Sequence, residues 1–325
     1  MHAPLITTKL YTPKPRHDLI SRPHLLDRVS AGLANKLTLI SAPTGYGKTT
    51  LMAEWCAGPG MECPVTWLAL EEGDNDATRF LAYLIAALQQ IQVGLGEDVL
   101  TLLHGGPPPT AALLGILINE LAVVPHEFAL VLEDYHAIEL LELHQMMVFL
   151  LDHLPPQMHL VILTRVDPPF PLARLRARGE LVEVRARELR FSLADTTVFV
   201  REMARLTLSD ETIEILFERT EGWITGLQLA ALSMQGQENP AELVAAFGSE
   251  RGYIVDYLIE EVLDRQPEDL CRFLLQTSIL NRLNGPLCEA LTEQPDGEAT
   301  LEQLEKANLF LSPLGDEERW YRSES

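Results

Sequence analysis

The segment 42–50 combines residue types that can bind the phosphate groups of a nucleotide, in the order Ala42-Pro43-Thr44-Gly45-Tyr46-Gly47-Lys48-Thr49-Thr50. Gly45 and Gly47 can adopt the backbone conformations that turn N–H groups inward around a β-phosphate. Lys48 can reach the β- and γ-phosphates, and the Thr49 hydroxyl can bind Mg²⁺. The usual pattern begins with Gly, where this chain has Ala42, another small residue. The segment predicts a Walker A loop that binds a purine nucleotide, ATP or ADP, with Mg²⁺.

Two adjacent carboxylates, Glu133 and Asp134, follow the apolar run Ala129–Leu132. They predict a Walker B element, in which one carboxylate holds Mg²⁺, usually through water. The other can orient or deprotonate the attacking water. The common order places Asp first, so the residue types leave open which of the two joins Thr49 as a metal ligand. The longer side chain of Glu133 predicts slow hydrolysis, and the alternative is a pair of solvent-exposed acids at the end of a strand.

Arg165 follows another apolar run, His159–Thr164. Ligands of open α/β sheets bind at the carboxyl ends of the strands, so Arg165 is in the right layer to contact a γ-phosphate. We therefore predict Glu133, Asp134 and Arg165 as the catalytic residues. A surface salt bridge is the alternative role for Arg165.

Short apolar runs alternate with helix-length amphipathic stretches as far as about residue 185. The runs that predict buried parallel strands are Leu37–Ser41, Val65–Leu70, Ala129–Asp134, His159–Arg165 and Leu181–Arg185. The stretches that predict helices are Thr49–Cys56, Ala77–Gln90, Ala111–Val123 and Leu140–His153. This alternation predicts an α/β fold, a P-loop NTPase parallel sheet with helices on both faces, in a nucleotide-binding domain of residues 1–185.

The strand pattern stops after residue 190. Three stretches predict a small helical domain of residues 186–245, namely Ala194–Arg205, Asp210–Arg219 and Thr225–Gln235, with Asp195 and Asp210 as N-caps. Three more helical patterns follow at Gly252–Gln266, Pro267–Gln276 and Gly297–Ala307. They precede a hairpin pattern formed by Leu309–Leu314 and Arg319–Arg322. Helices followed by a hairpin predict a winged-helix domain of residues 246–325, which we expect to be truncated.

The composition limits which partners the chain can bind and where it can function. Of its 325 residues, 25 are Lys or Arg and 47 are Asp or Glu, which gives a formal net charge of −22. Such a surface repels a phosphate backbone, so we do not expect the chain to bind nucleic acid on its own. Four cysteines without paired metal-binding spacing predict reduced thiols and a cytoplasmic protein. The sequence has no stretch of about 18 apolar residues, so we expect no membrane span.

Several motifs together resemble one known family. They are Thr8–Pro15, Ser21-Arg22-Pro23, Ser41–Thr50, Leu70–Asp76, Leu130–His136, Thr164–Arg176, Glu221–Leu229, Ala307–Leu311 and Trp320-Tyr321-Arg322. The chain resembles the N-terminal part of MalT-type regulators, the large ATP-binding LuxR-type transcription activators. These belong to the signal-transduction ATPases with numerous domains (STAND).

The resemblance implies a regulatory switch whose enzyme activity is at most that of a slow STAND ATPase. Arg22 would lie beside the adenine, and the remaining nucleotide contacts would come from Pro43, Thr44, Gly45, Tyr46, Gly47, Lys48, Thr49 and Thr50. ADP would hold a resting monomer, and inducer plus ATP would open the module and promote self-association. The inducer and DNA would be bound only by domains of the parent protein that this chain does not include.

Two departures from the family pattern stand out. The family usually has two Asp where this chain has Glu133-Asp134. It also continues after the hairpin with a helix whose His can touch the nucleotide phosphates, whereas this chain ends at Ser325. Two other classes remain as alternatives. A P-loop phosphotransferase would need an acceptor-binding motif that we do not find, and a ring-type motor ATPase would need an arginine finger from a neighbouring subunit.

Overall fold

The computed structural model describes residues 5–15, 19–58, 63–105, 110–234, 266–280, 282–292, 294–306, 311–313 and 320–323. The chain divides into two compact units. The first comprises Met1–Ser41 and Lys48–Glu188, and the second comprises Ala42–Gly47 and Leu189–Ser325. The three-domain division at residues 185 and 245 stays a prediction.

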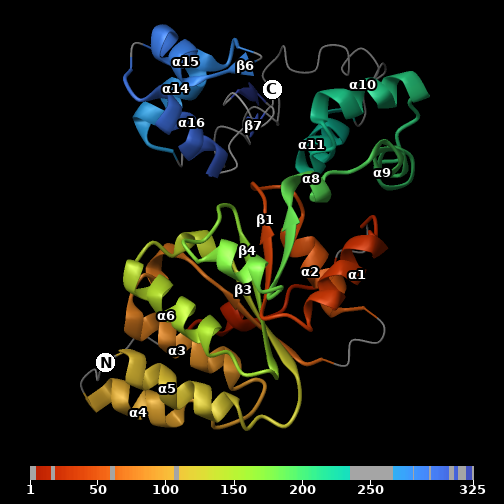
Figure 1. Ribbon diagram of the computed structural model, residues 1–325. Helices are drawn as coiled ribbons and strands as arrows, with labels where there is room; N and C mark the ends of the chain where they lie inside the picture. The colour runs from red at the N-terminus through yellow and green to blue at the C-terminus, as the bar shows by residue number, and fades with distance from the viewer. Residues whose placement is uncertain are drawn as a thin grey trace. The chain divides into compact units, whose positions relative to one another are not determined.

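The first unit contains a five-stranded parallel sheet in the order β2-β3-β4-β1-β5 (Figure 1). Its strands are β1 (Leu37–Ser41), β2 (Val65–Ala69), β3 (Phe128–Glu133), β4 (Met158–Thr164) and β5 (Leu181–Arg185). Every residue of β1 and β4 is buried, which is why these central strands are continuous apolar runs rather than alternating ones. The predicted parallel sheet is confirmed.

Helices cover both faces of this sheet. Figure 1 shows α1 (Pro23–Gly32) and α2 (Lys48–Cys56) on one side and α3 (Ala77–Leu88) and α6 (Leu141–Asp152) on the other. Helices α4 (Glu97–Gly105) and α5 (Thr110–Leu121) pack beside α3 and α6. The four predicted helices are confirmed, whereas α1, α4 and the short α7 (Leu172–Ala177) were not predicted.

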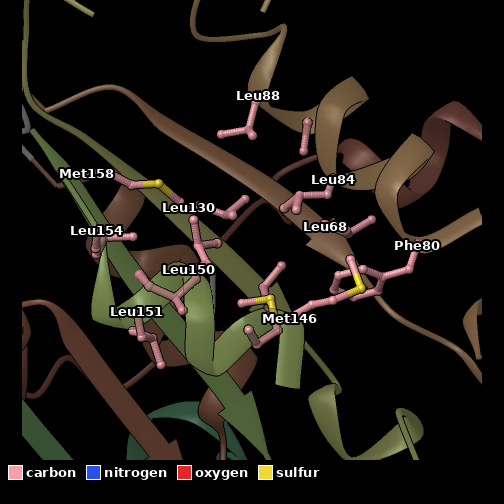
Figure 2. Close-up of a cluster of buried hydrophobic side chains, with 14 of the residues drawn as sticks. Leu68, Phe80, Leu84, Leu88, Leu130, Met146, Leu150, Leu151, Leu154 and Met158 are labelled. Atoms are coloured by element: carbon pink, nitrogen blue, oxygen red, sulfur yellow. The ribbon is translucent and has the colours of Figure 1, made fainter. Parts of the chain in front are cut away.

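An extensive hydrophobic core lies between the sheet and helices α3 and α6 (Figure 2). Helix α3 contributes Phe80, Leu84 and Leu88, whose four-residue spacing places them on one helical face. They pack with Leu68 of β2 and Leu130 of β3. This core fixes β2 and β3 side by side, so that their carboxyl ends lie at the same edge of the sheet.

A buried ion pair anchors the N-terminal segment to the first unit. Lys9, in the short 3-10 helix η1 (Thr7–Leu10), is buried and pairs with the fully buried Asp74. Arg79 donates to the other oxygen of Asp74 at 3.0 Å. The Lys9 ammonium also lies 4.3 Å from the ring centroid of Tyr83. Asp74 therefore has a cationic partner on each oxygen, which a carboxylate buried this deeply requires.

The second unit begins with helices joined by short connections. They are α9 (Leu193–Val198), the π-helical turn η4 (Phe199–Met203), α10 (Asp210–Thr220) and α11 (Ile224–Met234), after the short α8 (Ala186–Leu189) that ends at the boundary. The predicted N-caps were wrong by a few residues. Ser192 caps α9 and Ser209 caps α10, because each hydroxyl accepts the N–H three residues later. Asp195 is instead the N3 partner of Ser192 in a capping box, and Asp210 is the first residue of α10.

The carboxyl-terminal part of the second unit combines helices with a small antiparallel sheet. The helices are α14 (Glu268–Thr277), α15 (Gly285–Thr292) and α16 (Gly297–Lys306), and the sheet has the order β6-β8-β7 with β6 (Arg282–Leu283), β7 (Leu311–Pro313) and β8 (Tyr321–Ser323). The antiparallel pairing of β7 with β8 confirms the predicted hairpin strands. The predicted helix Gly252–Gln266 and the hairpin turn lie outside the described residues. Within the described part of the chain, no helix has the length and apolar character needed to cross a bilayer.

Candidate nucleotide-binding site

The phosphate-binding segment predicted at 42–50 connects strand β1 to helix α2. Strand β1 ends at Ser41 and α2 begins at Lys48. Gly45 and Gly47 have φ angles of 78° and 79°, values that side-chain-bearing residues adopt at a cost. A Cβ on Gly45 would also lie 2.5 Å from the hydroxyl oxygen of Thr225. Both glycines are thus required by the backbone conformation, as a phosphate-binding turn needs.

Two residues of the second unit hold the carbonyl groups of this loop. The Trp223 indole N–H donates to the Thr44 carbonyl at 3.3 Å. Thr225 donates to the Gly45 carbonyl twice, from its hydroxyl at 3.0 Å and from its backbone N–H at 3.2 Å. Thr225 lies in the first turn of α11, where backbone N–H groups have no partner within the helix. The Gly45 carbonyl therefore caps the start of α11. The carbonyl groups of Thr44 and Gly45 are both fixed by hydrogen bonds from Trp223 and Thr225.

Lys48 lies among charged side chains of the first unit. It is only 8% exposed. Burial lowers the pKa of Lys48 to about 8; the charge of Asp134 opposes this shift, Arg165 adds to it and Glu133 opposes it. These four side chains are therefore close enough to interact, as predicted from the carboxyl ends of the strands. Phosphate oxygens beside Lys48 would favour its charged form.

Glu133, the last residue of β3, is hydrogen-bonded through both carboxylate oxygens. The Thr49 hydroxyl donates to Oε1, and the Trp67 indole N–H donates to Oε2 at 3.0 Å. Burial raises the pKa of Glu133, whereas the hydrogen bond from Thr49 lowers it. The structure thus joins the first turn of α2 to the end of β3 through Thr49 and Glu133.

Asp134 has a different environment from Glu133, although the two are adjacent. Its backbone is left-handed, with φ of 53° and ψ of 41°. Its side chain is 50% exposed and lies 3.8 Å from Nδ1 of His136. The chain leaves the strand at this residue, so Asp134 does not continue the alternation of β3. One carboxylate of the pair is fixed by neighbouring donors and the other faces solvent.

The comparisons with known proteins agree with the motif analysis. A family model described as the MalT winged helix domain matches residues 259–325. The HTH-type transcriptional regulator MalT of Serratia proteamaculans is 34% identical over 321 residues, which cover 98% of this chain and 35% of that protein. The protein of the same description from Yersinia enterocolitica is 35% identical over 322 residues, with the same two coverages. The chain is similar to MalT regulators over nearly its whole length. It spans about a third of the length of these relatives.

A solved structure supports the fold of the MalT-like chain. It is that of a STAND protein with a tetratricopeptide repeat sensor from Pyrococcus horikoshii. The TM-score is 0.51, the alignment covers 96% of this chain and 42% of that chain, and the two are 17% identical. At this identity the likeness concerns the fold alone. Together with the winged-helix match, it confirms the predicted class of a P-loop NTPase sheet followed by helices and a winged helix.

Asn75 fixes the segment that follows the two acids. Its side-chain oxygen accepts the N–H groups of Glu139 at 2.7 Å and Leu140 at 3.1 Å. Its amide nitrogen donates to the Ala137 carbonyl at 2.6 Å. One side chain therefore satisfies three backbone groups of the segment after Asp134, which restrains the turn that holds this acid.

The donor set fits Mg²⁺. The Thr49 hydroxyl and the carboxylates of Glu133 and Asp134 are hard oxygen donors, as Mg²⁺ prefers. Among the described residues, no group of three or more His, Cys, Asp or Glu side chains gathers as in an all-protein metal site. A site of few protein ligands is the usual arrangement where phosphate oxygens and water complete the coordination of Mg²⁺.

The nucleotide contacts predicted from the sequence all remain predictions. Arg22 is buried at the N-cap position of α1, and its contact with adenine is untested. The roles of Pro43, Tyr46 and Thr50 are likewise untested. Conversely, the sequence analysis did not find Trp67, because an aromatic residue in an apolar strand normally indicates only packing. Only its place on β2 could have indicated a role, because β2 pairs with β3, the strand that ends in the acids.

Proposed function

We propose that this chain is the nucleotide-dependent switch of a MalT-like transcriptional regulator. It would bind ADP or ATP with Mg²⁺ and hydrolyse ATP slowly. The observation that carries the proposal is the hydrogen bond from the Thr49 hydroxyl to Glu133. It links the helix that follows the phosphate-binding turn to the acidic end of β3, the two elements that must act on one Mg²⁺–nucleotide complex.

The phosphates would be bound by charge and by the backbone. Gly45 and Gly47 have the conformations that expose backbone N–H groups, and α2 would direct the positive end of its dipole at the phosphates. The ammonium group of Lys48 would compensate their negative charge. Because Lys48 is buried and partly uncharged near pH 8, phosphate binding there would be accompanied by proton uptake.

The remaining polar residues would divide the work of hydrolysis. Mg²⁺, when bound, neutralises the charge that develops on the phosphate oxygens. We propose that Thr49 and Glu133 hold it, because the Thr49 hydroxyl and the Glu133 carboxylate lie within hydrogen-bond distance of one another. Asp134, which is half exposed, would orient the attacking water. Arg165, whose charge acts on Lys48, would stabilise the γ-phosphate.

The regulatory role follows if ADP and ATP favour different arrangements of the chain. A ligand shifts a conformational equilibrium only by its difference in affinity for the two states. We propose that ADP favours a resting monomer and that ATP favours self-association. The relatives are described as HTH-type transcriptional regulators, so DNA and inducer would be bound by parts of the full-length regulator other than this chain.

The first test is nucleotide binding by the wild type and by Lys48→Ala. Saturating Mg-ADP at about 100 times its Kd should stabilise the wild type by about 2.7 kcal/mol, which is several degrees of unfolding temperature. Lys48→Ala should lose this gain, because the compensating cation is gone. The measurement is thermal unfolding with Mg-ADP, with Mg-ATP and with neither, after release of any copurified nucleotide.

A matched control is Lys36→Ala. Lys36 lies just before β1 and pairs with Glu180 at 3.2 Å, so its removal deletes a lysine and an ion pair away from the phosphate-binding turn. It should keep the full nucleotide response. An unchanged response in Lys48→Ala, or no response in the wild type, would sink the proposal.

A further inference from the structure

We propose that Trp67 is a positioning residue for Glu133, holding its carboxylate beside Thr49 so that the pair can receive Mg²⁺. The inference rests on the proposed function, since it concerns how the metal side of that site is built. Trp67 would not touch the nucleotide. It would act only through Glu133.

The pairing of β2 with β3 places Trp67 beside the carboxylate of Glu133. Ala69 pairs with Glu133 and Trp67 with Val131 in the register between β2 and β3. Trp67 is therefore two residues before the partner of Glu133, on the same face of the sheet. Its side chain is fully buried, and its indole N–H meets Oε2 of Glu133 at 3.0 Å.

The two donors orient the carboxylate. Thr49 donates to Oε1 and Trp67 to Oε2, so rotation of the group would break both bonds. Each carboxylate oxygen has a second lone pair, which stays available to a cation or its bound water. The two donors come from different elements, Thr49 from the first turn of α2 and Trp67 from β2, the neighbour of β3 in the sheet.

A purely structural role for the indole would not need a carboxylate. Trp55, in α2, is also buried and donates its indole N–H at 3.0 Å, to the hydroxyl of Ser30. A neutral acceptor is thus sufficient for a buried tryptophan in this same unit. Glu133 is partly buried, which costs solvation of a charged group, and a role in metal binding would explain that cost.

The length of Glu133 fits this arrangement. An Asp at position 133 would withdraw the carboxylate by about 1.5 Å, the length of one C–C bond. It could then not keep hydrogen bonds to both Thr49 and Trp67 without a shift of the backbone. The Glu that departs from the common acidic order and the tryptophan on the neighbouring strand therefore form a matched pair.

The test compares Trp67→Phe with Trp55→Phe. Each variant keeps an aromatic ring and removes one buried indole hydrogen bond of 3.0 Å, so general destabilisation is matched. ADP affinity measured in EDTA should stay within about twofold of wild type in both. The Mg²⁺ concentration that gives half of the Mg²⁺-dependent gain in ADP affinity should rise about tenfold or more in Trp67→Phe, the effect of losing one hydrogen bond to a carboxylate. Trp55→Phe should not change it.

Glu133→Asp changes the acceptor of the Trp67 hydrogen bond instead of the donor. It tests the same proposal if Trp67→Phe does not fold. Although it restores the common residue, it should raise the half-saturating Mg²⁺ concentration. In the double variant the two effects should be less than additive, because Trp67→Phe removes a bond already lost. The readout is calorimetric titration of Mg²⁺ into the ADP-bound protein, which does not depend on turnover.

The outcomes separate the two proposals. If the wild type binds no nucleotide, the proposed function itself is wrong and the role of Trp67 falls with it. If the wild type binds Mg-ADP but Trp67→Phe and Trp55→Phe need the same Mg²⁺ concentration, only the positioning role is overturned. Glu133→Asp binding Mg²⁺ as well as the wild type would likewise overturn it.

Discussion

At the scale of single residues, Glu133 and Asp134 show how adjacent acids acquire different roles. Glu133 is the last residue of a buried strand and is fixed by two donors. Asp134 turns into a left-handed conformation and is half exposed. The difference arises because the strand ends between them. A partly buried, oriented carboxylate suits metal binding, and a more exposed one suits contact with a water molecule.

Arg165 provides a prediction at this scale. It lies close enough to Lys48 to lower the pKa of that lysine, so an anion bound beside both cations would relieve their repulsion. ATP has one more phosphate group than ADP. Arg165→Ala should therefore reduce ATP affinity about tenfold or more while reducing ADP affinity only about twofold, given the strength of hydrogen bonds to charged groups. Equilibrium titration with each nucleotide and Mg²⁺ checks this.

The control for that prediction is Arg174→Ala. Arg174 is exposed and pairs with Asp152, so it removes an arginine and an ion pair from the surface of the same unit. Its nucleotide affinities should equal those of the wild type. Equal losses of ATP and ADP affinity in Arg165→Ala would reject a γ-phosphate contact and would favour the surface salt bridge.

Residue type alone predicts some site residues and not others. Gly45 and Gly47 could be predicted because their positive φ angles follow from the turn that a phosphate needs. Lys48 could be predicted because its charge and its position relative to the glycines form one pattern. Trp67 could not, since its role depends on which strand lies beside β3. That neighbour is a property of the folded sheet.

At the scale of elements, the strands of the parallel sheet and the helices that cross between them were predictable, whereas helices α1, α4 and α7 were not. In the parallel sheet the predicted strands differ from the structure by at most one residue at each end, because burial makes the central strands β1 and β4 nearly continuous apolar runs. Helix α7, with six residues, was missed, since so short a helix depends on tertiary packing more than on its own sequence. The caps at Ser192 and Ser209 were assigned too late because a nearby Asp satisfies the same composition rule.

Helix α11 gives a prediction at the element scale. Its first turn is capped by the Gly45 carbonyl through Thr225, so order in the phosphate-binding loop and order at the start of α11 are coupled. Saturating ADP should slow amide hydrogen exchange at residues 225–227, because a loop fixed by phosphates holds its carbonyl in place. Thr225→Val removes the hydroxyl donor and should weaken ADP binding about threefold, with or without Mg²⁺.

The matched control is Thr220→Val. The Thr220 hydroxyl donates within its own helix, to the Leu216 carbonyl at 2.8 Å, so the same chemical change leaves the loop untouched. Thr220→Val should keep the wild-type ADP affinity and the wild-type exchange response of α11. If ADP leaves exchange at α11 unchanged in the wild type, the loop and the helix are not coupled.

At the scale of the whole molecule, net charge opposes the self-association that we propose. Each copy carries a formal net charge of −22, so two copies repel one another at long range. Any nucleotide-dependent contact must therefore gain enough short-range free energy to exceed this repulsion. The same charge argues against nucleic-acid binding by this chain alone, which is consistent with assigning DNA binding to other parts of the full-length relatives.

Salt dependence tests this balance. Raising the ionic strength from about 0.01 M to 0.15 M shortens the Debye length from about 30 Å to 8 Å, which screens the repulsion between copies. With saturating Mg-ATP, sedimentation velocity should therefore show more of the associated species at the higher ionic strength, and with Mg-ADP the chain should remain monomeric at both. Lys48→Ala should not respond to ATP. Association that weakens as salt is added would mean that attractive charge pairs hold the copies together, and association equal in ADP and ATP would remove the nucleotide from control of assembly.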